Sequence, residues 1–124
     1  MSRGRVLLLE DDPALRGLLL EVLGLEDFDV VQCEGYDEIR RAAADELGDI
    51  IVADFWGGAQ RTLNDADRQQ IRDLTALRPV ILLTGRTWAS ETTAGELGAH
   101  ALMRKPFDID NLLTAIESIL QPGS

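Results

Sequence analysis

Residues 6–13 read VLLLEDDP, a short apolar run that ends in three acidic residues and a proline. The run is continuous rather than alternating, which is typical of a strand that is buried on both faces of a parallel sheet. Asp12 followed by Pro13 is a helix start signal, with the aspartate as N-cap and the proline at the first helical position. The stretch therefore predicts a buried strand that passes at once into a helix.

The same strand-then-helix unit recurs along the chain. Apolar strand patterns occupy residues 6–9, 28–33, 50–53, 80–83 and 101–103. Helical patterns follow them at residues 13–23, 36–47, 64–77, 87–97 and 109–120. Five such units with short loops predict an α/β domain with a parallel sheet, helices on both faces and right-handed crossovers.

Some of these elements are weaker than others. The strands at 28–33 and 101–103 are interrupted or short, which suits the edges of the sheet. The helix at 87–97 contains four threonines or serines and Gly95, so we expect it to be labile. The first helix is expected to bury one apolar stripe, formed by Leu15, Leu18, Leu19, Val22 and Leu23.

Length and composition narrow the class of protein. The 124 residues suit a single domain over 1–124, with a core at about 5–120 and a tail at 121–124. Cys33 is the one cysteine, so it is expected to be a small buried hydrophobe in a cytoplasmic protein without disulfides. No apolar run approaches the ~20 residues of a membrane span, and no signal-peptide pattern is present. The formal net charge of −10 opposes direct binding to nucleic acid or to an anionic membrane.

Polar residues collect at the carboxyl ends of the predicted strands, where open parallel sheets place their sites. The first strand leads into Glu10, Asp11 and Asp12; the third ends in Asp54, the fourth in Thr84, and the fifth leads to Lys105. Alone, Thr84 would be read as a strand-end hydroxyl bonded to the backbone, and Lys105 as a solvated cation. Together the four strand ends indicate one site.

The acidic residues of this rim point to a metal ion. Asp12 is expected to cap the first helix, which leaves Glu10 and Asp11 without a capping role. Two carboxylates 4 Å apart repel by roughly 4 kcal/mol at an effective dielectric near 20. Carboxylate oxygens suit Mg²⁺ or Mn²⁺, and no His or Cys cluster indicates zinc. His100, the one histidine, is expected to be a partly exposed residue at a strand edge.

Four segments in order carry a resemblance to a known family: residues 6–13, Asp54, the LLTG of residues 82–85, and the GAHALMRKPF of residues 98–107. They resemble the receiver domains of bacterial response regulators over about residues 5–120. The resemblance implies a doubly wound, CheY-like (flavodoxin-like) fold with five parallel strands in the order 2-1-3-4-5.

The resemblance also implies a role for each rim residue. Asp54 would accept a phosphoryl group from a histidine kinase or phosphotransfer protein. Thr84 and Lys105 would contact the phosphoryl oxygens, and the Lys105–Pro106 bond resembles the cis bond of the family. Mg²⁺ or Mn²⁺ would be held by four groups: the carboxylates of Asp11 and Asp54, Glu10 through water, and the main-chain carbonyl of Trp56.

Three features depart from the family pattern. Gly57–Gly58 stands where Met-Pro is usual, Leu102 takes the place of the usual aromatic switch residue, and the stretch between Thr84 and Gly98 is one residue short. Leu102 and Gly57–Gly58 favour an alternative, a phosphorylation-independent pseudo-receiver that acts as a protein-interaction adaptor. A flavodoxin or a haloacid-dehalogenase-type phosphatase fits the acidic rim poorly.

As a receiver, the protein would be a regulatory domain and not an enzyme, beyond Mg²⁺-dependent self-phosphorylation and autodephosphorylation. Its partners would be the phosphoryl donor and a downstream protein that the sequence does not name. The resemblance also allows a homodimer through the face formed by the fourth helix, the fifth strand and the fifth helix.

Overall fold

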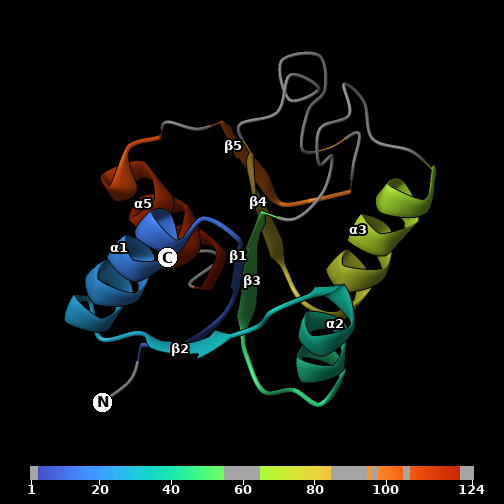
Figure 1. Ribbon diagram of the computed structural model, residues 1–124, viewed down its shortest axis with the longest axis horizontal. Coiled ribbons are helices and arrows are strands. Elements are labelled where there is room, and N and C mark those ends of the chain that lie inside the picture. The colour runs from blue at the N-terminus through green and yellow to red at the C-terminus, as the bar shows by residue number, and fades with distance from the viewer. Residues whose placement is uncertain (1–2, 55–64, 85–94, 96–97, 105–106, 121–124) are drawn as a thin grey trace.

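The protein folds around a parallel sheet of five strands in the order β2-β1-β3-β4-β5 (Figure 1). The computed structural model describes residues 3–54, 65–84, 95, 98–104 and 107–120. In chain order the elements are β1 Arg5–Glu10, α1 Pro13–Leu25, β2 Asp29–Gln32, α2 Tyr36–Ala44, β3 Ile50–Asp54, α3 Asp65–Leu77, β4 Val80–Thr84, β5 Ala101–Arg104 and α5 Ile109–Leu120. The predicted fold class and strand order are confirmed.

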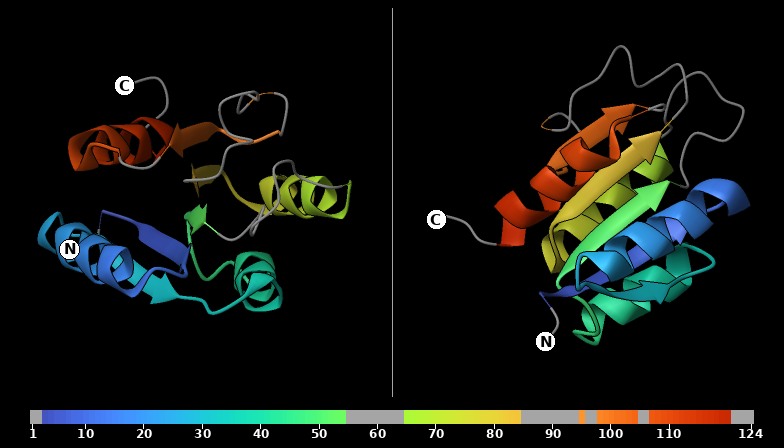
Figure 2. Two further views of the ribbon diagram at one scale, coloured as in Figure 1. Left: turned by 45° about the horizontal axis from the view of Figure 1, so that its top comes forward. Right: turned by 90° about the vertical axis from the view of Figure 1, so that its left-hand side faces the viewer.

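Helices cover both faces of the sheet. Helices α1 and α5 lie on one face and α2 and α3 on the other (Figures 1 and 2). Successive residues of β1 alternate between the two cores, so Leu7 packs with α2 and α3 while Leu8 packs with α1 and α5. Strands β3 and β4 are buried throughout, whereas β2 and β5 are half-buried edge strands, as predicted.

Two helix starts follow the predicted caps. The Asp12 carboxylate accepts hydrogen bonds from the amides of Ala14, at 3.0 Å, and Leu15, at 3.5 Å. The Asp108 carboxylate accepts from the amide of Asp110 at 2.9 Å, and α5 runs over the predicted residues. Side-chain oxygens here satisfy amides that have no partner within the helix.

Among the element boundaries that differ from the prediction, two differ because α1 and α2 end in the same way. Asp27 and Glu46 adopt left-handed backbone conformations, with φ of 66° and 59°. The amide of the next residue then bonds back into the helix, Phe28 to the Leu23 carbonyl and Leu47 to the Ala42 carbonyl, at 3.0 Å each. This is the Schellman motif. Strand β2 therefore begins at Asp29 rather than Phe28, and α2 ends at Ala44 rather than Leu47.

The expected apolar stripe of α1 is wrong at one position. Leu19 and Leu23 are buried and Leu15 and Val22 pack against them, but Leu18 is 45% exposed. Successive helical residues are about 100° apart, so Leu18 points away once Leu19 faces the core. The outer face of α1 therefore carries an exposed leucine.

Several predictions fall outside the described residues. They concern the helix at 87–97, apart from Gly95, and the Lys105–Pro106 bond. Over the ranges that the structure describes, every helix is too short or too polar to cross a lipid bilayer.

Candidate functional site

The carboxyl ends of β1 and β3 bring three carboxylates together. The two strands pair in parallel register, and their last residues, Glu10 and Asp54, are direct partners. Asp11 follows Glu10, and one carboxylate oxygen from each of the three residues lies within 4.8 Å of the others. Glu10 is 2% exposed and Asp54 6% exposed, while Asp11 is exposed. The cluster is thus buried on its sheet side and open beside Asp11.

The loop after β1 is held by its own side chains. Glu10 Oε1 accepts a hydrogen bond from the amide of Asp12 at 3.1 Å. The Asp12 carboxylate points the other way, onto the first amides of α1. The predicted division therefore holds in geometry: Asp12 caps the helix, and Glu10 and Asp11 join Asp54.

Thr84 is placed on the same rim as the cluster. It ends β4, the strand next to β3, it is 1% exposed, and its register partner on β5 is Arg104. Lys105 follows Arg104 directly, but Lys105, Trp56 and Gly57–Gly58 lie outside the described residues. Their assigned roles stay predictions.

The donor set of the cluster suits a hard divalent cation. Three carboxylates offer oxygen ligands, which Mg²⁺ and Mn²⁺ prefer. His100 is exposed and precedes β5, where its amide donates to the Val80 carbonyl at 2.9 Å. The cluster could hold a metal ion, and the described part of the chain places no histidine or cysteine in it.

Arg16 contacts this loop and was not singled out from the sequence. Its guanidinium Nη1 donates to the main-chain carbonyl of Glu10 at 3.3 Å, and the side chain is partly buried. Its position in the sequence could have indicated this contact. Arg16 stands in the first turn of α1, where a cation interacts unfavourably with the helix dipole.

The structure also describes Leu102 and Cys33, two further residues that the sequence singles out. Leu102 is half-buried and packs against the core beneath α2 and α3. Cys33, just beyond β2, is buried as expected; burial raises its pKa to about 11, and the Glu38 carboxylate acts in the same direction.

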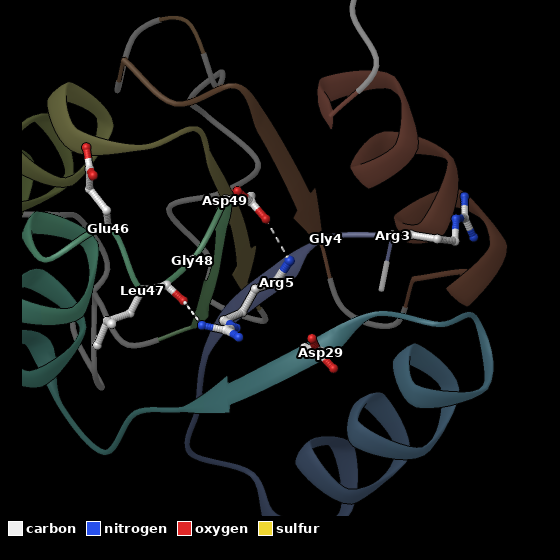
Figure 3. A pocket seen from close by; sticks show the side chains of 8 residues that line it. All are labelled: Arg3, Gly4, Arg5, Asp29, Glu46, Leu47, Gly48 and Asp49. Atoms are coloured by element: carbon white, nitrogen blue, oxygen red, sulfur yellow. Dashed lines mark hydrogen bonds between the residues drawn. The ribbon is translucent and has the colours of Figure 1, made fainter. Parts of the chain in front are cut away.

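The opposite, amino edge of the sheet holds a second group of charges around an open hollow of about 340 Å³ (Figure 3). Here the Asp49 carboxylate accepts from the amide of Arg5 at 2.8 Å, and the Arg5 guanidinium donates to the Leu47 carbonyl at 3.3 Å. The side chain of Arg3 points away from that of Arg5 (Figure 3). Its guanidinium lies 3.0 Å from Glu117 and over the ring of Phe28.

The chain is similar to proteins of one class. It is 32% identical to the transcriptional regulatory protein TrcR of Mycobacterium tuberculosis, over 97% of this chain and 46% of that protein. It is 29% identical to the DNA-binding transcriptional regulator NtrC of Azospirillum brasilense, over 100% of this chain and 26% of that protein. The chain thus spans less than half the length of these relatives. No protein-family model matches it.

Solved structures agree with these sequence relatives. The BeF₃-activated N-terminal receiver domain of Klebsiella pneumoniae RstA aligns with a TM-score of 0.73 at 26% identity, covering 94% of this chain and 98% of that one. A CheY-like receiver domain from Methanospirillum hungatei aligns with a TM-score of 0.74 at 22% identity, covering 96% and 94%.

Fold, strand-end acids and relatives together define the class as CheY-like signalling modules. Within that class the chain is a response-regulator receiver domain. Receiver domains are regulatory modules of two-component signal transduction.

Proposed function

We propose that Asp54 is the phosphoacceptor of this receiver domain. A carboxylate oxygen of Asp54 attacks the phosphorus of a phosphohistidine on a histidine kinase or phosphotransfer protein. The P–O bond forms as the P–N bond breaks, and the leaving imidazole nitrogen keeps the electron pair and takes up a proton. The observation that carries the proposal is the position of Asp54, buried at the end of a central strand and within 4.8 Å of two further carboxylates.

The same cluster is proposed to hold Mg²⁺ or Mn²⁺ through Asp11, Asp54 and Glu10, with the Trp56 main-chain carbonyl as a further ligand. A bound divalent cation would neutralise charge on the phosphoryl oxygens. The three carboxylates alone would repel an incoming anion. The burial of Glu10 and Asp54 makes that repulsion less screened than at an open surface.

Thr84 and Lys105 are proposed to complete the site. The Thr84 hydroxyl, buried at the end of the neighbouring strand, is suited to donate to a phosphoryl oxygen. Lys105 would supply a cation to another oxygen. Phosphoryl transfer needs mainly positioning and charge neutralisation, so these groups suffice without a further acid or base.

The partners proposed for the domain follow from its class. A histidine kinase or phosphotransfer protein would supply the phosphoryl group in the cytoplasm, where the single thiol of Cys33 stays reduced. The change at Asp54 would alter contacts with a downstream protein. Pairing of two copies through β5, α5 and the helix predicted at residues 87–97 is one form such contacts could take. Activity on its own phosphoryl group, by self-phosphorylation or autodephosphorylation, is the most that we propose as catalysis.

The alternative, an adaptor that does not use phosphorylation, has one observation in its favour. Leu102 occupies a half-buried position on β5 and carries no ring that could swing between two states. The relatives of the chain do not favour this alternative.

Calorimetry with Mg²⁺ and then beryllofluoride, a phosphoryl mimic, tests the proposal. We expect the wild type to bind Mg²⁺ and then beryllofluoride, and Asp54→Asn to bind no beryllofluoride. Asp49→Asn at the amino edge removes the same charge and should behave as the wild type. Incubation with acetyl phosphate should add one phosphoryl group, seen by mass spectrometry, to the wild type and to Asp49→Asn only. Phosphorylation of Asp54→Asn at the wild-type yield would refute the assignment.

A further inference from the structure

Arg16 occupies a position that helix electrostatics disfavour. It is the fourth residue of α1, after Pro13, Ala14 and Leu15, and the first turn contains no acidic residue. Cations near a helix N-terminus are unfavourable because that end carries a partial positive charge. A partly buried arginine at this place needs a compensating interaction.

The compensating interaction lies at the acidic cluster. Arg16 Nη1 donates to the carbonyl oxygen of Glu10 at 3.3 Å, and that carbonyl belongs to the peptide that joins Glu10 to Asp11. A planar guanidinium is therefore fixed at the main-chain link between Glu10 and Asp11, two of the three residues of the acidic cluster. Arg3, Arg5 and Arg78 are placed differently, since their hydrogen bonds lie at the amino edge.

We propose that Arg16 is a positioning residue that acts as a resident counter-charge for the acidic cluster. Its guanidinium offsets part of the repulsion among Glu10, Asp11 and Asp54 while no metal is bound, so that the loop after β1 keeps its shape. A divalent cation offsets the same repulsion when it binds. The inference deepens the proposed function, because it assumes that these carboxylates are the metal site.

If Arg16 has this role, replacing it should weaken folding in the absence of metal and strengthen metal binding. Without metal, Arg16→Gln loses the counter-charge, and the three carboxylates destabilise the folded protein. With metal, the dication supplies the neutralisation, and it is no longer repelled by the nearby guanidinium. Arg16→Gln should therefore be less stable than the wild type without Mg²⁺ and should bind Mg²⁺ more tightly.

Thermal unfolding with and without saturating Mg²⁺, together with Mg²⁺ calorimetry, tests this. We expect the Tm of Arg16→Gln to fall by roughly 2–5 °C without Mg²⁺, and the difference from the wild type to close at saturation. Its Mg²⁺ affinity should rise on the order of threefold to tenfold. Arg16→Lys keeps the charge and should restore both values. Arg41→Gln, an exposed position in the last turn of α2, removes the same charge at the amino edge and should leave Mg²⁺ affinity unchanged.

Two results would overturn the role of Arg16. The first is a Tm difference that Mg²⁺ does not change, since it would reduce Arg16 to a hydrogen bond with the main chain. The second is weaker Mg²⁺ binding by Arg16→Gln. A wild type that binds no Mg²⁺ would instead contradict the proposed function. The role of Arg16 can then still be tested without metal. Arg16→Gln should lower the Tm by less when Asp11 is also replaced by Asn than it does in the wild type. An equal loss of Tm in both backgrounds would overturn the role of Arg16.

Discussion

The two edges of the sheet both gather charged side chains, but they arrange them in opposite ways. At the amino edge charges of opposite sign meet: Arg3 lies 3.0 Å from Glu117, and Arg78 lies 3.5 Å from Glu46. At the carboxyl edge three carboxylates lie within 4.8 Å of one another. The amino edge stabilises itself, whereas the carboxyl edge gathers like charges.

The difference between the two edges shows that the arrangement of charged side chains is a better guide to the functional site than the presence of a cavity. The cavity of about 340 Å³ lies at the amino edge, where Arg5, Glu46 and Asp49 already have hydrogen-bond or ion-pair partners (Figure 3). Bringing buried carboxylates together lowers stability, and proteins keep such arrangements mainly at functional sites. The carboxyl edge is therefore the part of the sheet where clustered carboxylates lower the stability of the fold and indicate a functional site.

Packing at the amino edge is expected to give the largest change in stability. Gly48 is buried, and a Cβ atom at this position would lie 2.5 Å from Leu7 Cγ. Gly48→Ala should lower the free energy of unfolding by about 2–3 kcal/mol, measured by urea denaturation. Gly24→Ala is the control, because Gly24 is exposed in α1 and a Cβ atom there would meet no side chain within 4 Å. It should raise stability by about 0.5–1 kcal/mol. A Gly48→Ala protein as stable as the wild type would mean that the amino edge is loosely packed.

At the carboxyl edge, removing a charged side chain should raise the stability of the folded protein, whereas Gly48→Ala at the amino edge lowers it. Asp54→Asn relieves repulsion within the cluster, so the metal-free free energy of unfolding should rise by about 1–2 kcal/mol at low salt. Saturating Mg²⁺ should reverse the order, because the wild type gains more from the bound ion. Urea denaturation with Mg²⁺ and with a chelator measures both values. If the variant were the less stable protein in chelator, the contrast between the edges would fail.

A carboxylate of the amino edge gives the matched comparison. Asp49→Ala removes the acceptor that bonds the Arg5 amide at 2.8 Å. The free energy of unfolding should fall by about 1 kcal/mol, by the same amount with and without Mg²⁺. Asp49→Asn keeps an acceptor oxygen and should lie near the wild type. A dependence of the Asp49→Ala effect on Mg²⁺ would show that the two edges are coupled.

The features that could be predicted from the sequence are set by local chemistry. Asp12 and Pro13 predict the start of α1 correctly, because helix capping depends only on residues that are neighbours in the sequence. Glu10 and Asp54 could be placed together because each directly ends an apolar run, and parallel strands share an edge. The strand order came from a resemblance, since strand–helix alternation is compatible with more than one order.

The features that were missed depend on backbone conformation or on side-chain reach. Helix α2 stops at Ala44 because Glu46 adopts a left-handed conformation that a glycine would have signalled. Leu18 could not be separated from Leu19 by an apolar pattern alone, because the pattern does not show which leucine faces the core. The contact from Arg16 to Glu10 arises from a long side chain that folds back, which hydrophobic periodicity does not encode.

The smallest effect concerns Cys33, which lies beyond β2 on the carboxyl side. Burial, aided by Glu38, raises its pKa from 9.0 to about 11. The folded state therefore holds the thiol proton more tightly than the unfolded chain. The stability from this difference is complete below about pH 9 and is lost as the pH rises toward 11. By about pH 9.5 the wild type should have lost somewhat less than ~1 kcal/mol relative to Cys33→Ala. Urea denaturation of both proteins from about pH 8 to about pH 10 measures the loss. A difference that stayed constant with pH would mean that water reaches the thiol, and that this side of the sheet is more open than its burial indicates.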